Sequence, residues 1–272
     1  MKKNRTTSAV FIPMPKVAKA ARAWYIVGTG REDGKMIEKL QKIIDGGRRI
    51  AFFGGAGVST ESGIPDFRST DGLYNQKYDY PPETILSDRF FTLRTEEFFR
   101  FYRDKMLFPD AKPNKAHLWL AELEKKGRLS GIVTQNIDGL HHKAGSREVF
   151  ELHGSVWRNR CMLCGKMHSL EFIQNSTGIP RCECGGCVKP DVVLYGEGLD
   201  TPTVNGAIRS IAKADVLIIA GTSLTVYPAA GFVREFSGRH LVVINRDETH
   251  MDHDADLVIH ANVGETLSQI SI

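Results

Sequence analysis

The chain has 272 residues, of which 42% are hydrophobic and 25% are charged. A chain of this length and apolar content can bury a substantial core, as one large domain or as a main domain with an insertion. Because no apolar run approaches the roughly 20 residues of a membrane span, and the first residues lack an uninterrupted apolar region, we expect neither a membrane segment nor an export signal.

The net charge of +4 is unevenly distributed along the chain. Residues 1–35 contain eight Lys or Arg residues against Glu32 and Asp33, which leaves a charge of −2 for the remaining residues. A basic excess confined to one end favours a mobile tail over a nucleic-acid-binding surface. We therefore predict a basic N-terminal extension over residues 1–34 and no nucleic-acid partner.

Short apolar runs recur along the chain, and each ends in polar or glycine residues. The runs are continuous rather than alternating, which indicates strands covered on both faces of a parallel sheet. Helical patterns precede several of them, at 35–45, 114–126 and 203–214, the last with a cap at Asp200 or Thr201. This alternation predicts a doubly wound α/β domain with a Rossmann-like sheet. The expected strands are Arg49 to Phe53, Gly131 to Thr134, Glu148 to Glu151, Asp215 to Ala220, His240 to Asn245 and Asp256 to His260.

Two segments interrupt this alternation and are predicted to be insertions. Residues 66–113 are rich in aromatic residues and prolines, with helical pieces around 96–106, and residues 154–198 contain all five cysteines. The chain is therefore predicted to contain one domain over residues 35–272. Its parts are a Rossmann-like part over about 35–65, 114–153 and 199–272, a small helical insertion over about 66–113, and a small zinc-binding module over about 154–198.

The first expected strand runs into a glycine-rich turn, Gly54-Gly-Ala-Gly57. Backbone N–H groups of such a turn can hold a pyrophosphate. The third glycine of the G-x-G-x-x-G dinucleotide pattern is missing, because Thr60 stands there, and a turn without a ligand is the alternative. However, Gly221-Thr-Ser223 and Asn245-Arg-Asp247 follow two other expected strands, and open α/β sheets bind ligands at these strand ends. The pattern favours an extended ligand with phosphates and riboses.

Amide, carboxylate and imidazole groups are expected at the same edge of the sheet. The second strand ends in Thr134-Gln-Asn-Ile-Asp-Gly-Leu-His141, and the third is followed by His153. A histidine with a pKa near 6.5 can act as a general base at neutral pH. We therefore predict His153 as the base, with His141 and His142 as rivals.

Four of the cysteines form two close pairs, Cys161-Met-Leu-Cys164 and Cys182-Glu-Cys184. Two such pairs let four thiolates converge on a tetrahedral zinc ion, about 2.3 Å from each sulfur. Four protein ligands leave no open position for water, so the predicted zinc is structural. Cys187 leaves a second assignment open, in which it replaces Cys182. Metal ligation rather than disulfides indicates a reducing compartment, so we expect a cytoplasmic protein.

These motifs together resemble those of the sirtuins, a family of NAD-dependent protein-lysine deacylases. The resemblance covers about residues 36–272 and leaves the N-terminal extension outside. Seven motifs in the same order make it specific. They are Gly55-Ala-Gly-Val-Ser-Thr-Glu-Ser-Gly-Ile-Pro-Asp-Phe-Arg68, Thr134-Gln-Asn-Ile-Asp138, His153-Gly154, the cysteine pairs, Lys189-Pro-Asp-Val-Val-Leu-Tyr-Gly-Glu197, Gly221-Thr-Ser223 and Ile244-Asn245.

The resemblance implies that NAD is cleaved rather than reduced, so the third glycine of a hydride-transfer enzyme is not required. The acyl oxygen of a modified lysine would attack the anomeric carbon as nicotinamide leaves, in a water-poor pocket walled by Phe67 and Ile137. His153 would then deprotonate a ribose hydroxyl, and the products would be lysine, nicotinamide and O-acyl-ADP-ribose. The catalytic residues implied by the family are His153, Asn136, Asp138 and Arg68.

The family also implies which residues bind NAD and the acylated-lysine protein substrate. The substrate peptide would add as a strand beside Val193 and Tyr195. The pyrophosphate, nicotinamide ribose and adenosine of NAD would each meet a different strand end. The implied NAD contacts are Ala56, Thr60, Phe67, Arg68, Gln135, Ile137, Asp138, Thr222, Ser223, Asn245 and Val263.

Two further details follow from the resemblance. Cys184-Gly-Gly-Cys-Val-Lys-Pro190 matches the pattern that follows the fourth zinc ligand, which implies Cys161, Cys164, Cys182 and Cys184 as ligands. Sirtuins that remove succinyl groups share a Tyr-x-x-Arg pair, and Phe99 and Tyr102 stand at these positions here. The resemblance therefore implies a deacetylase with poor activity on succinyl-lysine.

Three other functions were weighed against this one. An NAD(P)-dependent oxidoreductase would normally have an acidic residue closing the second strand, and Val133-Thr-Gln135 has none. A zinc-ribbon interaction module with a vestigial cofactor site is disfavoured because the implied catalytic residues are all present. A protein mono-ADP-ribosyltransferase on the same fold is the alternative to the deacetylase.

Overall fold

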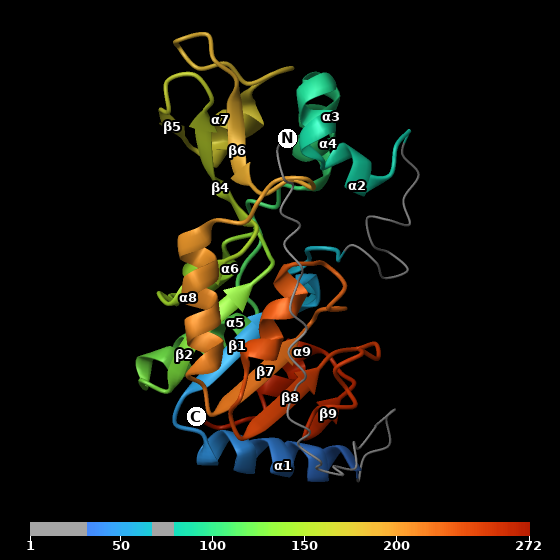
Figure 1. The fold of residues 1–272 in the computed structure, drawn as a ribbon, viewed down its shortest axis with the longest axis vertical. Helices are drawn as coiled ribbons and strands as arrows, with labels where there is room; N and C mark the ends of the chain where they lie inside the picture. Colours follow the sequence, from blue (N-terminus) through green and yellow to red (C-terminus); the bar gives the residue numbers. More distant parts are fainter. Residues whose placement is uncertain (1–31, 67–78) are drawn as a thin grey trace, which may run out of the picture.

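A computed structural model describes residues 32–66 and 79–272 (Figure 1). Residues 1–31 of the predicted N-terminal extension and the predicted site residues Phe67 and Arg68 lie outside the described residues, whereas residues 32–34 begin α1. A large lobe surrounds a parallel sheet, and a smaller lobe lies at one end of the molecule (Figure 1). Within the described ranges, every helix is too short or too polar to span a bilayer.

Six parallel strands form the sheet of the large lobe, in the order β3-β2-β1-β7-β8-β9. β1 and β7 are buried along their whole length, which explains their continuous apolar sequences. This is the Rossmann strand order, in which successive strands are added on one side of β1 up to β3 and on its other side from β7 onward. All six predicted strands are confirmed. They are β1 (Ile50–Gly54), β2 (Leu129–Thr134), β3 (Val149–Glu151), β7 (Val216–Ala220), β8 (His240–Ile244) and β9 (Leu257–Ile259).

Helices cover both faces of this sheet, so the predicted doubly wound fold is confirmed. Phe52 and Phe53 are successive residues of β1, and their side chains belong to cores on opposite faces. The core around Phe52 contains α1, α5 and α9, and the core around Phe53 contains α8 and η4. The elements are α1 (Glu32–Gly46), α5 (Lys115–Lys125), α6 (Leu140–Lys143), α8 (Thr201–Ala212), η4 (Ala229–Glu235) and α9 (Val263–Leu267).

Two helices of the large lobe begin at polar caps. The side chain of Asp200 accepts a hydrogen bond from the Thr203 amide at 2.9 Å, which confirms the predicted cap of α8. Asn114 caps α5 in the same way through the Ala116 amide.

The smaller lobe combines both predicted insertions around one core. Its three-stranded antiparallel sheet has the order β5-β4-β6. Phe98, Phe99 and Tyr102 of the helical insertion pack in one cluster with Val156 and Val188 of the cysteine-containing segment. The elements are α2 (Pro82–Ile85), α3 (Asp88–Leu93), α4 (Thr95–Lys105), β4 (Gly154–Cys161), β5 (Met167–His168), α7 (Leu170–Asn175) and β6 (Val188–Val192).

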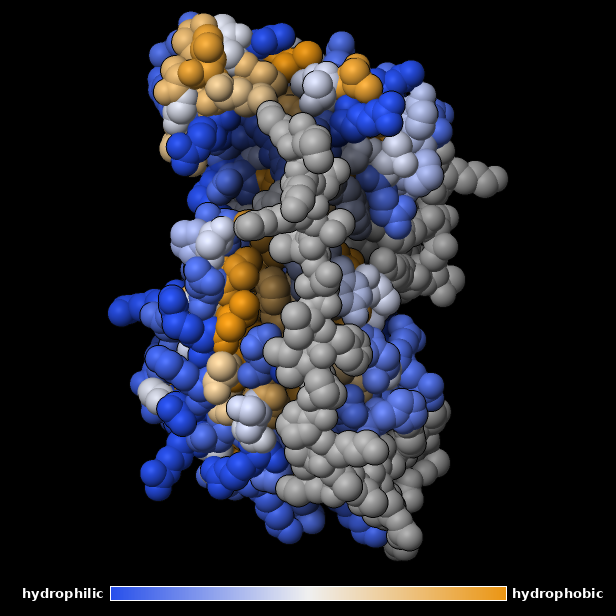
Figure 2. Space-filling model, in the orientation of Figure 1, coloured by the Kyte–Doolittle hydropathy of each residue, from blue (hydrophilic) through white to orange (hydrophobic). Residues whose placement is uncertain are grey.

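The outer end of the smaller lobe carries apolar surface (Figure 2). Met162, Leu163 and Met167 are among its exposed large side chains, with Leu163 72% exposed. Met162 and Leu163 lie in the turn between Cys161 and Cys164, and Met167 lies in the short strand β5.

Candidate active site

A cavity of about 340 Å³ lies between the two lobes, at the carboxyl ends of β1, β2, β7 and β8. Strand ends near a reversal of strand order are the usual ligand site of such a sheet. Most of the predicted site residues meet here. Those that line the cavity are Ala56, Gln135, Asn136, Ile137, Asp138, His153, Val193, Tyr195, Thr222, Ser223 and Asn245.

Two described residues that were predicted to contact the cofactor do not line this cavity. The Thr60 hydroxyl donates to the Gly57 carbonyl at 3.0 Å and thereby braces the turn. Val263 is 2% exposed and packs in the core beneath α9. Both support the wall of the cavity from behind.

The glycine-rich turn after β1 lies directly against the turn after β7. The Gly57 amide donates to the Gly221 carbonyl at 2.8 Å. A Cβ on Gly57 would lie 2.7 Å from the Gly221 Cα, so no larger residue fits. Instead of one helix, two 3₁₀ turns follow β1, η1 (Ala56–Val58) and η2 (Thr60–Ser62). The segment then ends at Gly63, whose φ of 81° is left-handed.

Glu61 connects η2 to the last helix of the chain. Its carboxylate accepts hydrogen bonds from the amides of Gly264 at 2.6 Å and Glu265 at 3.1 Å. These amides belong to the first turn of α9, where a negative charge is favourable. The contact spans more than 200 residues of sequence, and local patterns carry no signal for it.

A hydrogen-bonded network places the Asp138 carboxylate in the cavity wall. The Ser59 hydroxyl donates to Asp138 Oδ2 at 2.6 Å, the Leu140 amide donates to Oδ1 at 2.8 Å, and Asn136 Nδ2 donates to Ser59 Oγ at 3.0 Å. Burial raises the pKa of Asp138, and the hydrogen bonds from Ser59, Leu140 and Asn136 oppose that rise. Sequence reasoning missed Ser59, although it lies inside the glycine-rich motif.

The hydrogen bond of His153 fixes which ring nitrogen can accept a proton. His153 Nδ1 lies 3.0 Å from the Gln135 carbonyl oxygen, which can only accept, so Nδ1 carries the hydrogen. Nε2 of the neutral ring is therefore the basic atom. Burial lowers the pKa of His153, partly opposed by the bond to Gln135, so the ring is neutral at pH 7.

The two rival histidines lie elsewhere. His141 is 2% exposed and packs beside Phe52 and His117. His142 lies near the surface, with Nε2 4.0 Å from the Glu151 carboxylate. Within the described ranges, His153 is the only histidine that lines the cavity.

The segment after β6 forms the opposite lip of the cavity. The Val193 amide donates to the His153 carbonyl at 3.0 Å, and the Tyr195 amide donates to the Leu86 carbonyl at 2.9 Å. Glu197 stabilises the turn, because its carboxylate accepts from the Leu194 amide at 2.8 Å and from Lys189 at 3.2 Å. This lip is thus an ordered, extended backbone segment.

Lys105, Met106 and Phe108 of the helical insertion line the cavity, whereas Phe99 and Tyr102 do not. Phe99 and Tyr102 of α4 are fully buried, and Arg103 donates to the Ser176 hydroxyl and, at 2.7 Å, to the Gly178 carbonyl. Arg103 is therefore turned toward the cysteine-containing segment. Lys105, which pairs with Asp104 at 3.1 Å, lines the cavity instead.

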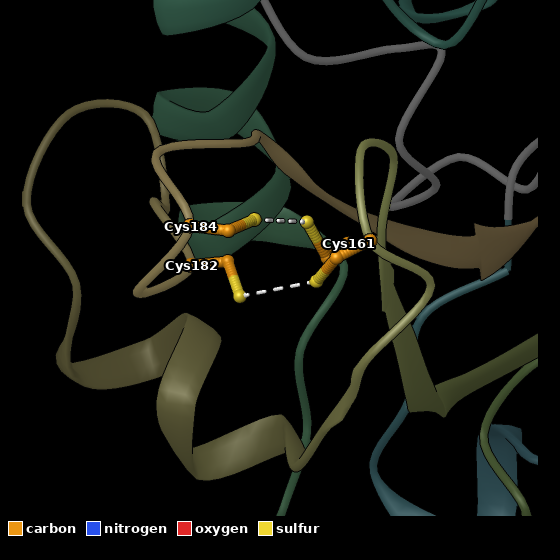
Figure 3. A group of neighbouring side chains, drawn as sticks. Cys161, Cys182 and Cys184 are labelled. Carbon is orange, nitrogen blue, oxygen red and sulfur yellow. Dashed lines mark hydrogen bonds between the residues drawn. The ribbon is translucent and has the colours of Figure 1, made fainter.

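Four cysteine sulfurs lie together in the smaller lobe, all within 4.8 Å of one another. The Cys161–Cys184 and Cys164–Cys182 sulfur pairs are 3.4 and 3.7 Å apart. Cys161 comes from one loop, and Cys182 and Cys184 come from a second loop that faces it (Figure 3). Sulfurs 2.3 Å from a tetrahedral zinc are about 3.8 Å from each other, so the group fits this metal. A Cβ on Gly186 would lie 2.7 Å from Cys161 Sγ, which explains the glycine. Cys187 lies outside the group, which favours the assignment with Cys182 as the third ligand.

Comparisons with known proteins agree with this geometry. The model of the Sir2 family matches residues 55–228. An NAD-dependent protein deacetylase of Clostridium acetobutylicum is 56% identical over 238 residues, which cover 86% of this chain and 97% of that protein. The corresponding protein of Cutibacterium acnes is 54% identical over 235 residues, covering 86% of this chain and 96% of its own length.

Solved structures show the same fold. A Sir2 enzyme with a deacetylated p53 peptide and 3′-O-acetyl ADP-ribose is 38% identical, with a TM-score of 0.78, and the match covers 86% of this chain and 96% of that one. A Sir2 homologue in complex with NAD is 39% identical, with a TM-score of 0.76, over 85% of this chain and 91% of that one.

A Rossmann-like sheet with a four-cysteine lobe and a histidine in the cleft between them defines a sirtuin-type fold and site. The chain belongs to the Sir2 family.

Proposed function

We propose that the protein is an NAD-dependent protein-lysine deacetylase that transfers the acyl group from lysine to ADP-ribose and releases nicotinamide. The observation that carries this proposal is the position of His153. Its neutral ring lies in the cleft between the carboxyl ends of the strands of the large sheet and the Val193 lip, with Nε2 as the basic nitrogen. Relatives of known structure include Sir2 enzymes bound to an acetyl-ADP-ribose and to a propionylated peptide, which supports the same reaction.

The three strand ends suit the three parts of NAD. We assign the turn at Ala56 to the pyrophosphate, residues 135–138 to the nicotinamide and its ribose, and residues 222–223 and Asn245 to the adenosine. NAD supplies the electrophilic anomeric carbon. The Ser59 and Leu140 hydrogen bonds orient the Asp138 carboxylate, and Gln135 Nε2 donates to Thr222 Oγ1 at 3.0 Å, which joins two of the strand ends.

His153 acts as the general base in this proposal. Its Nε2 accepts a proton from a ribose hydroxyl, while the Gln135 carbonyl keeps the ring in the required tautomer. The proposed catalytic group also includes Asn136, Asp138 and Arg68. The proposed NAD contacts also include Phe67. Thr60 and Val263 would act on NAD through the backbone or by supporting the wall, since their side chains do not line the cavity.

The substrate is proposed to be an acylated-lysine protein, bound in an extended form beside Val193 and Tyr195. One Sir2 structure of the same fold contains a propionylated peptide. The four cysteines would hold one structural zinc, with no free position for catalysis. Since a thiolate site must remain reduced, we propose a cytoplasmic location.

Mass spectrometry of the products from NAD and an acetyl-lysine peptide tests the proposal. We expect free lysine peptide, nicotinamide and O-acetyl-ADP-ribose in equal amounts. Labelled NAD in the same reaction distinguishes the alternative. Label that remains on protein, without loss of acetyl groups from the peptide, would identify a mono-ADP-ribosyltransferase instead.

A further inference from the structure

The strand β4 contains an irregularity beside the active site. Its pairing with β6 shifts register between Ser155 and Asn159, and Trp157 lies within this bulge. Bulges next to active sites commonly redirect a side chain away from the regular alternation of the strand. Trp157 is 43% exposed, and its neighbour Arg158 in the same strand is also exposed.

The indole of Trp157 lies against the turn that carries Asp138. Its Nε1 donates a hydrogen bond to the Asp138 backbone carbonyl at 2.7 Å. Gly139 has a φ of 72°, and a Cβ there would lie 2.6 Å from Trp157 Cδ1, so the indole occupies the space of a side chain at position 139. The neighbouring Val156 amide donates to the Ile137 carbonyl at 3.0 Å. Val156 and Trp157 of the bulge thus contact three successive residues of the turn, 137–139.

Asp138 is thus held from both lobes. Ser59 of the large lobe and the local Leu140 amide fix its carboxylate, and Trp157 of the smaller lobe fixes its backbone oxygen. Arg158, the next residue of β4, donates to Glu151 at 2.6 Å and to Asp191 at 2.8 Å. These contacts tie the bulge to β3 and β6 and prevent it from shifting along the strand.

We propose that Trp157 is a positioning residue for the Asp138 carboxylate, through which the placement of the smaller lobe sets the efficiency of NAD cleavage. The proposal rests on the proposed function in one respect, namely that Asp138 contacts NAD. It identifies the indole N–H as the group that matters, because the ring contact with Gly139 alone would not hold the carbonyl.

A pair of matched tryptophan variants tests this. Trp157→Phe removes the N–H and keeps an aromatic ring. Trp119→Phe makes the same chemical change at a distant, buried site, where Nε1 donates to the Ile270 carbonyl at 2.9 Å. Both are made in the full chain. Steady-state kinetics with NAD and an acetyl-lysine peptide, zinc content and the thermal midpoint are measured for each.

For Trp157→Phe we expect kcat/KM for NAD to fall about three- to tenfold, the range of one ordinary hydrogen bond. The peptide KM and the zinc content should stay at the parental values. Trp119→Phe should lower the thermal midpoint and leave kcat/KM for NAD unchanged. An unchanged kcat/KM in Trp157→Phe would overturn the proposal, and so would loss of zinc, which would make the residue structural. A parent protein without NAD-dependent deacetylation would instead refute the proposed function.

Discussion

The six-stranded and three-stranded sheets are stabilised by different means. The large sheet is covered by helices on both faces, and its two cores contain residues from nearly every strand. The three-stranded sheet includes a strand of only two residues, and Met162 and Leu163 in the turn after β4 are exposed. Burial of apolar surface therefore accounts for the large lobe, whereas the smaller lobe also depends on α2–α4 and on four cysteines.

This difference affects the active site, because each lobe supplies one side of it. The large lobe places polar groups at strand ends, where the sheet itself determines their positions. The smaller lobe supplies the Val193 lip and the Trp157 contact, whose positions depend on a sheet with less buried surface of its own. Changes to the smaller lobe should thus affect folding and catalysis together, and changes at the strand ends should affect catalysis alone.

Removal of the metal should have the largest effect, because it should unfold the smaller lobe. Structural zinc sites contribute on the order of 10 kcal/mol to folding at neutral pH. We expect Cys182→Ser to lose zinc, to expose the smaller lobe to proteolysis and to abolish activity. Cys187→Ser is the matched control and should keep zinc and activity, since its sulfur lies outside the group. Metal analysis and limited proteolysis decide the matter, and the opposite pattern would reverse the ligand assignment.

Loss of the proposed base should affect the chemistry and leave the fold intact. A general base contributes about 10²- to 10⁴-fold to rate. We expect His153→Ala to lower deacetylation by this factor, while NAD affinity, measured by calorimetry, changes only a few-fold. His142→Ala serves as the control, because His142 does not line the cavity. Turnover of His153→Ala within a few-fold of the parent would remove His153 from the mechanism.

Measurement of the acyl preference tests what the helical insertion contributes to the cleft. Arg103 faces Ser176 and Gly178, so it is not positioned to meet an acyl carboxylate in the cavity. Leaving a carboxylate unpaired in an apolar pocket costs several kcal/mol. We expect kcat/KM to be at least about tenfold higher for acetyl-lysine than for succinyl-lysine on one peptide. A preference for succinyl that disappears in Lys105→Ala would show that Lys105 recognises the carboxylate.

A pH dependence of stability is also expected, and it belongs to the large lobe. Burial lowers the pKa of His117 to about 4 and that of His141 well below its usual value. Below pH 6.5 the unfolded chain binds protons that the folded chain excludes, so stability falls as the pH falls toward 4. At pH 5 the lowered pKa of His117 costs about 2 kcal/mol of stability, and that of His141 acts in the same direction.

The variant His141→Leu should remove its share of this loss. Urea unfolding at pH 7 and pH 5 should give a smaller difference in unfolding free energy for this variant than for the parent. His142→Leu, at the surface, should keep the parental difference. An equal difference in unfolding free energy between pH 7 and pH 5 for all three proteins would mean that His141 is protonated in the folded state.

Local sequence determined most of the large lobe. The apolar runs indicated all six strands, and Asp200 marked the start of α8, because burial and capping depend on neighbouring residues. The cysteine spacing indicated the four-thiol group for the same reason, and the ordered motifs indicated the family. His153 was preferred over His141 and His142 from its place after a strand, and the cavity contains it alone of the three.

Only the tertiary structure decided how these parts meet. Nothing in the sequence pattern placed the two insertions in one core, the Ser59 hydroxyl on Asp138 or the Trp157 indole on the same residue. Ser59 and Asp138 are 79 positions apart, and Glu61 and Gly264 are 203 apart. Such contacts depend on how the strands and the two lobes pack against each other, and the spacing of residues along the chain carries no record of that packing.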